Sequence, residues 1–240
     1  MLRDTEGIMP AESTNDDVGE WVERWLSSPR FAVYLNAAGN DRDAALALYE
    51  RNARLGSALS HDLAHLEVGL RNAYDGALTE HLELPRHWTA CGDQVFAPVL
   101  RTRKRGSRGK VTVDINARPR ASLDRAIREA GGRKAPPGKV IAQLTFGFWR
   151  YLTSAAHEVT LWRPALHHAY PAGTSRSDVD ARIGRLHELR NRVAHHEPLL
   201  GLDAPSLHVD LLEIATLLSP QLGSYVAESS IVPGLLTARE

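Results

Sequence analysis

Residues 177–198 read SDVDARIGRLHELRNRVAHHEP, and this stretch decides the fold class. Its apolar residues recur at i, i+4, i+7, i+10 and i+14, the spacing of an amphipathic helix with about 3.6 residues per turn. These residues are Val179, Ile183, Leu186, Leu189 and Val193. The pattern predicts a helix with one buried face, closed by Pro198 because proline cannot continue a helix.

Similar periodicity runs through most of the chain. Between residues 41 and 84 there is no proline, and Gly56 with Ser57 predicts a break between two helices, the second ending before Pro85. Further helices are expected at residues 18–26, where Pro29 ends or kinks the helix, and at residues 117–130, 140–152 and 204–218. Residues 101–116 favour a short strand or extended loop, and residues 164–174 a loop. Without repeats or strand–helix alternation, the sequence predicts an all-α helical bundle with a small basic insertion.

The composition indicates a folded globular protein. The 240 residues are 43% hydrophobic and carry 29 basic and 29 acidic side chains, which excludes a uniformly basic nucleic-acid coat. We expect a polar tail at residues 1–17 and one domain at residues 18–240. The single Cys91 excludes an intramolecular disulfide, and no signal peptide or membrane span is expected, so the cytoplasm is the predicted compartment.

The neutral total hides a basic segment. Residues 101–139 hold thirteen Lys or Arg and three Asp or Glu, a net charge of +10 that the rest of the chain balances with −10. Such runs are typical of solvated loops, and they also suit a strip that follows nucleic-acid phosphates without reading sequence. In the second interpretation Arg103, Lys104 and Arg105 contact the substrate.

Residues 189–198 combine the groups that metal-free RNA cleavage requires. Asn191 and His195 are spaced i, i+4 and are therefore neighbours on a helix face, with Arg190 beside Asn191. An imidazole exchanges a proton near neutral pH, and a guanidinium holds a phosphate and offsets charge in a phosphoryl transition state.

Arg190, Asn191 and His195 match the Arg-Asn-x-x-x-His motif of HEPN ribonucleases, and the chain resembles the Abi-like (abortive infection) branch of that superfamily. The likeness covers about residues 30–220. It is carried by HLEVGLRN at 65–72, LTFGFW at 144–149, LWRPAL at 161–166 and LRNRVAHHEP at 189–198.

This resemblance implies a helical bundle that forms a homodimer, in which two motifs meet in one composite cleft. It also implies an endoribonuclease that needs no metal or cofactor, leaves a 2′,3′-cyclic phosphate, and acts in phage defence or as a toxin. An antitoxin or other neutralising partner is a candidate partner of such a protein, and the sequence alone leaves open whether one exists. His195 would be the acid/base group, Arg190 the phosphate clamp and Asn191 the orienting residue. Glu67 would be the acidic residue of an earlier helix. The further substrate-binding candidates are Arg71, Asn72, Arg192 and His196.

Each assignment has a structural alternative. Arg190 would also suit the negative end of a helix dipole or a bridge to Glu67, and His195 would suit the last helix carbonyls. His196 would suit a helix cap. The alternative function is a non-catalytic HEPN module that binds RNA or protein.

Two remaining patterns favour structural interpretations. His61 and His65 have the i, i+4 spacing of a zinc face but lack the intervening Glu and a third ligand, so no metal is expected, although metal-dependent hydrolysis stays an alternative. The aromatic residues of 146–151 would stack on bases or pack in the core or a dimer interface, and their apolar neighbours favour packing.

Overall fold

The computed structural model of the chain describes residues 19–104 and 109–237. The described residues are mostly helical, which confirms the predicted all-α class. Their strands form one hairpin, β1 (Leu100–Lys104) and β2 (Lys110–Asp114), paired antiparallel with Thr102 opposite Thr112. The basic segment therefore begins with a strand, one of its two predicted conformations.

The chain divides between Arg54 and Leu55 into two compact units. The first contains α1 (Glu20–Leu26), α2 (Ser28–Ala37) and the beginning of α3 (Arg42–His81). Its buried side chains are Val22, Leu26, Phe31, Tyr34 and Ala45.

Two expectations for residues 18–29 are corrected. The helix expected at residues 18–26 rests on an apolar stripe at helical spacing that includes Trp21 and Trp25. These two side chains are instead 45% and 55% exposed and stack on each other. The seven-residue α1 buries Val22 and Leu26 instead. Pro29 lies in the first turn of α2, where a missing N–H costs nothing, so it starts a helix as well as following one.

The predicted break at Gly56 and Ser57 is wrong, because α3 is one helix of 40 residues. A glycine inside a helix costs only about 1 kcal/mol, which tertiary packing readily offsets. The Cβ position of Gly56 lies 3.9 Å from the Leu199 side chain, so the helix packs closely there.

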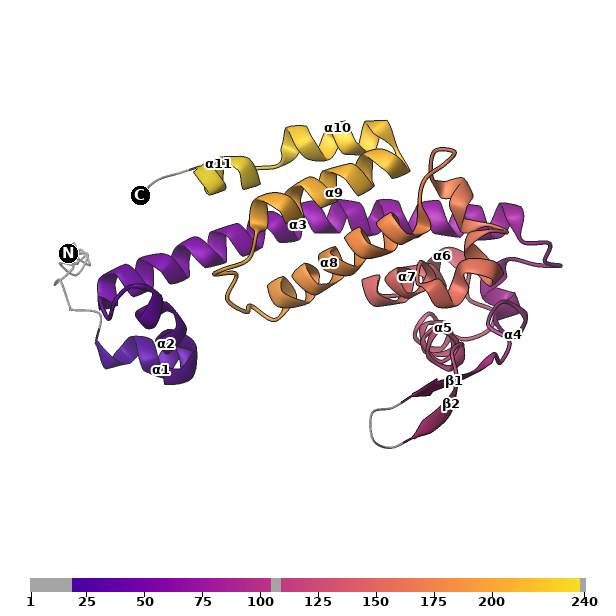
Figure 1. The fold of residues 1–240 in the computed structure, drawn as a ribbon, viewed down its shortest axis with the longest axis horizontal. Helices are drawn as coiled ribbons and strands as arrows, with labels where there is room; N and C mark the ends of the chain where they lie inside the picture. Colours follow the sequence, from indigo (N-terminus) through magenta and orange to yellow (C-terminus); the bar gives the residue numbers. More distant parts are fainter. Residues whose placement is uncertain (1–18, 105–108, 238–240) are drawn as a thin grey trace, which may run out of the picture. The chain divides into compact units, whose positions relative to one another are not determined.

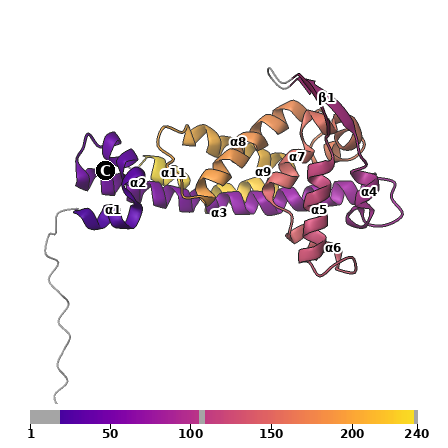
Figure 2. The ribbon, with the colours of Figure 1, turned by 90° about the horizontal axis from the view of Figure 1, so that it is seen from below.

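The second unit holds the rest of α3 and the elements that follow it (Figures 1 and 2). After the short turn η1 (Trp88–Cys91) and α4 (Gly92–Val95) come the hairpin and then α5 (Ala117–Glu129), close to its predicted bounds. The chain continues through α6 (Pro137–Ala142), α7 (Phe146–Leu152), η3 (Ala155–His157), the π-helical turn η4 (Glu158–Trp162) and η5 (Leu166–Ala169). The last helices are α8 (Arg176–Ala194), α9 (Ala204–Leu218), α10 (Pro220–Ser229) and α11 (Val232–Thr237).

The expected single helix over residues 140–152 is two helices. Gln143, Leu144 and Thr145 separate α6 from α7, and Phe148 N–H bonds the Thr145 carbonyl at 2.9 Å as α7 begins. Phe146, Phe148 and Trp149 are buried, as core packing predicts.

Helix α8 lies within the core of the second unit. It contacts α7 and α9, and α9 also packs against α10, so that α9 lies between α8 and α10 (Figure 1). The buried face of α8 joins leucines of α3 in one apolar cluster, through Val179, Ile183, Leu186 and Leu189. Val193 of the same helix is only partly buried. The apolar face predicted for α8 is therefore the face that packs into the core, apart from the partly buried Val193.

Candidate functional site

The predicted motif lies on the last turn of α8 and on its cap. At the start of this helix the Ser175 hydroxyl caps the Asp178 N–H at 3.4 Å. At its end the His196 N–H bonds the Val193 carbonyl at 3.1 Å and the Glu197 N–H bonds the Arg192 carbonyl at 2.8 Å. This pair of bonds is a Schellman cap.

Helix α8 therefore ends at Ala194, before Pro198, and the expectation that Pro198 closes it is corrected. His196 takes the left-handed backbone position of the cap, with φ of 53°, which glycine usually occupies. The alternative in which His196 is a helix cap therefore holds for its backbone, which takes part in the Schellman cap.

Arg190 is paired with Glu67 across two helices. Its Nε lies 3.7 Å from Oε2 of Glu67 on α3, and the side chains are 39% and 24% exposed. The structure therefore brings the motif together with the acidic residue expected from an earlier helix. The same contact is the predicted structural bridge, so both interpretations of Glu67 use one geometry.

His195 is exposed at the C-cap position. Its N–H bonds the Asn191 carbonyl at 3.0 Å, while no hydrogen bond or ion pair joins its side chain to another described residue. The Asn191 amide instead donates to Nε2 of His187 at 3.4 Å. The imidazole that contacts Asn191 is thus one helical turn before it.

His187 was missed by sequence reasoning, although the i, i+4 spacing to Asn191 was a usable signal. With Arg190 and Asn191 it lines a cavity of about 340 Å³ between α5, α7 and α8. The other lining residues are Arg118, Pro119, Ser122, Thr145, Phe146, Gly147, Phe148 and Tyr151. No carboxylate is among them.

The His187 ring is held in place by packing. It stacks on Phe146 with ring centroids 5.9 Å apart and an interplanar angle of 13°. A Cβ on Gly147 would lie 3.0 Å from Nε2 of His187, so glycine allows this close approach. Burial, followed by the charges of Arg150, Arg190 and Arg118, lowers the pKa of His187. The neutral imidazole therefore predominates at neutral pH.

The other predicted substrate-binding residues are scattered. Arg71 is half-buried and its buried Nε has no hydrogen-bond partner in the described chain, whereas Asn72 is exposed. Arg192 is exposed and its Nη1 donates to the Pro198 carbonyl at 3.4 Å. Arg103 and Lys104 are in β1, but their side chains, like the whole of Arg105, lie outside the described residues.

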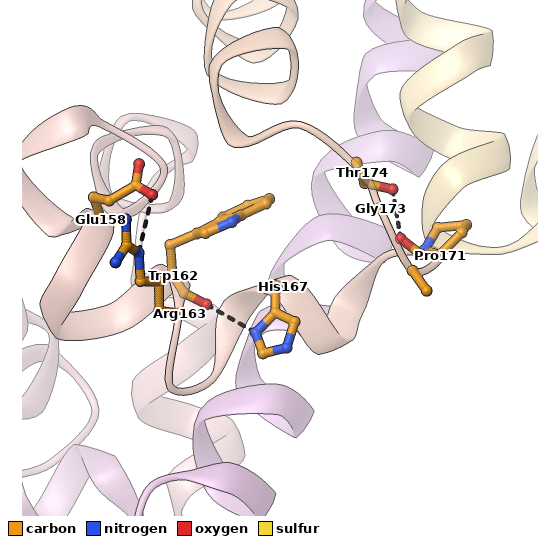
Figure 3. Close-up of a pocket in the computed structure, with 8 residues that line it drawn as sticks. Glu158, Trp162, Arg163, His167, Pro171, Gly173 and Thr174 are labelled. Carbon is orange, nitrogen blue, oxygen red and sulfur yellow. Dashed lines mark hydrogen bonds and ion pairs between the residues drawn. The ribbon is translucent and has the colours of Figure 1, made fainter.

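A second cavity, of about 330 Å³, surrounds Glu158 and Trp162 (Figure 3). Glu158 accepts hydrogen bonds from Arg163 at 3.3 Å and Arg176 at 2.5 Å, and these guanidinium groups lower its pKa. His167 at the same cavity bonds the Trp162 carbonyl at 3.1 Å (Figure 3). The charges of this cavity are thus paired within the protein.

A third cavity, of about 310 Å³, lies on the other side of α8 and includes Arg185, Arg192 and three carboxylates. Asp210 accepts hydrogen bonds from Arg185 at 2.7 Å and from Arg182 at 2.6 Å. Within this cavity the charge of Arg185 is therefore paired with the Asp210 carboxylate.

The described part of the chain contains no group of three or more His, Cys, Asp or Glu side chains arranged to hold a metal ion. Nε2 of His61 lies 3.4 Å from Nε2 of His65 without a further ligand. Within residues 19–104 and 109–237, no helix has the length and apolarity to cross a bilayer.

Comparison of the chain with models of protein families, with curated proteins and with solved structures finds no match.

Proposed function

We propose that this protein is a metal-independent endoribonuclease of the HEPN type, with Arg190, Asn191 and His195 at its active site. The observation that carries the proposal is the meeting of the motif with Glu67, whose carboxylate lies 3.7 Å from Arg190. A charged clamp, an amide and an exposed imidazole lie within six consecutive residues at the end of α8.

In this reaction the His195 imidazole takes the proton of a ribose 2′-hydroxyl, and the 2′ oxygen attacks the adjacent phosphorus. The bond from phosphorus to the 5′ oxygen breaks, and that oxygen leaves with a proton from a second acid. The products are a 2′,3′-cyclic phosphate and a 5′-hydroxyl end. Arg190 offsets the charge that grows on the phosphate oxygens, and a homodimer would supply the second imidazole from its other motif. The role in phage defence or as a toxin, with a neutralising partner, belongs to the same proposal.

The test is cleavage of single-stranded RNA by the purified full chain in EDTA, with product ends identified by mass spectrometry. We expect cyclic phosphate ends, no cleavage of DNA with the same sequence, and loss of cleavage in R190A and H195A. The control H167A removes an exposed histidine outside the motif. Full activity of R190A or H195A, or cleavage of DNA, would overturn the proposal, whereas activity lost only in EDTA would favour metal-dependent hydrolysis.

The homodimer has its own test, sedimentation of the active protein over a range of concentrations. We expect the activity to follow the dimer. An active monomer would overturn the composite site.

A second candidate is a non-catalytic module that binds RNA or protein. It is favoured by the exposed His195, whose side chain does not line the cavity and has no hydrogen bond to Asn191 among the described residues. RNA binding that survives H195A in a parent that cleaves no RNA would select this candidate.

A further inference from the structure

The cavity beside the motif has an unusual charge pattern for this chain. Arg118, Arg190 and His187 line it with an asparagine amide and three hydroxyl residues, and no carboxylate lines it. Both other cavities described above contain at least one carboxylate. Of these three cavities, it is therefore the one in which no lining carboxylate offsets the positive charges.

Arg118 is the arginine of this cavity for which the described residues supply no ion-pair partner. It is exposed in the first turn of α5, and no carboxylate of the described residues lies within ion-pairing distance. Arg190 has Glu67 at 3.7 Å, and Arg150, which does not line the cavity, has Asp180 at 3.8 Å. Each of these three arginines acts on the imidazole of His187. Such a convergence of positive charge attracts an anion.

The geometry also holds the polar groups in place before any ligand arrives. Phe146 supports the His187 ring and the Asn191 amide donates to its Nε2. Preorganised groups bind better because less conformational entropy is lost on binding. A volume of about 340 Å³ is in the range of pockets for small ligands.

We propose that this cavity binds a phosphate group of the RNA strand beside His187, with Arg118 contacting its oxygens, while Arg190 keeps its role at the phosphate that is cleaved. The identity of the strand rests on the proposed function, whereas the anion site rests on the cavity. Arg118 would thus position the substrate without taking part in proton transfer.

The experiment uses a fluorescent 2′-O-methyl RNA oligonucleotide, which the proposed reaction cannot cleave, and measures its binding by anisotropy at several KCl concentrations. We expect R118A to bind about tenfold more weakly, the effect of one charge-assisted hydrogen bond. The slope of log affinity against log salt should fall by about 0.7, the value for one phosphate contact on a single strand. R118K should keep the slope.

The matched control is R128A, which removes an exposed arginine of the same helix that lines none of the three cavities. Equal affinity and slope in R118A and R128A would overturn the inference. A second readout is the NMR titration of His187. Inorganic phosphate should raise its pKa in the parent and not in R118A, and an unchanged titration in the parent would also overturn the inference.

These outcomes are separable from those of the proposed function. If cleavage of unmodified RNA depends on His195 and R118A binds normally, the phosphate site in the cavity is overturned and the proposed ribonuclease function stands. If the parent protein binds the oligonucleotide through Arg118 and cleaves no RNA, the phosphate site in the cavity is supported and the proposed ribonuclease function is overturned.

Discussion

Nε of Arg190 on α8 lies 3.7 Å from Oε2 of Glu67 on α3, and this pair joins the two helices that carry the predicted site. Both side chains are partly exposed, and ion pairs of this kind contribute about 0–1 kcal/mol to folding. Stability therefore gives a weak reason for the pair, and in the proposed function Glu67 acts beside Arg190 at the active site.

Replacing the acidic partner should separate these roles. In E67Q we expect the unfolding free energy to fall by less than about 1 kcal/mol, and the rate of RNA cleavage to fall at least about tenfold, because an ionisable group of the site is lost. Urea denaturation and a cleavage time course measure the two effects. The control E80Q changes an exposed carboxylate of the same helix. Unchanged cleavage in E67Q would remove Glu67 from the site.

The two imidazoles near Asn191 should differ in kinetics. Replacing His195 with alanine should lower kcat by about 10²-fold or more, the contribution of a general acid or base. Replacing His187 should mainly raise KM, because this ring lines the cavity and lies away from the cap. Steady-state cleavage assays distinguish the two patterns. The reverse result would make His187 the proton-transfer group.

The left-handed backbone of His196 predicts a contrast between two small replacements. Both H196A and H196G remove the imidazole, but only glycine adopts a φ of 53° without steric cost. We therefore expect H196G to be more stable than H196A by about 1 kcal/mol. Thermal unfolding measures the difference, and equal stabilities would mean that the cap relaxes in solution.

Buried His157 predicts a loss of stability in mild acid. Burial, and then the charge of Arg101, lowers its pKa to about 4, and its buried Nε2 has no partner in the described chain. Because the unfolded chain binds this proton near pH 6.5, stability is present above that pH and is lost as the pH falls toward 4. The loss between pH 7 and pH 5 from this residue is about 2 kcal/mol.

The matched variant for this effect is H157F, which cannot titrate. Urea denaturation at both pH values should show a smaller pH dependence in H157F than in the parent. Identical pH dependences would exclude His157 as the cause and leave His168 and His187, whose pKa values are also lowered.

The contact of α9 with α10 depends on one small residue. A Cβ on Gly223 would lie 2.9 Å from Cα of Thr216 and closer still to its hydroxyl, so G223A should destabilise the fold by about 2 kcal/mol through overpacking. G76A is the control, since nothing lies within 4 Å of its Cβ position in α3. Alanine favours a helix over glycine, so G76A should stabilise the protein by up to about 1 kcal/mol. Equal effects in the two variants would contradict this packing.

Local patterns accounted for much of the helical structure. The bounds of α9 agree with the prediction and those of α5 and α8 are close to it, because a 3.6-residue apolar period is a property of consecutive residues. The motif could be located for the same reason, since Arg190, Asn191 and His195 are neighbours in sequence. Breaks were harder to predict, as Gly56 and the gap at residues 143–145 show, because packing decides whether a weak signal interrupts a helix.

By itself, then, the sequence determined the all-α class, the buried face of α8 and the residues of the motif. Only the tertiary structure decided that Glu67 meets Arg190, that His187 contacts Asn191, and that Arg118 on α5 lines the same cavity. The first set depends on contacts within one or two helical turns. The second depends on helices distant in sequence that are brought together to bury a shared core, and no local period records which polar residues meet at its edge.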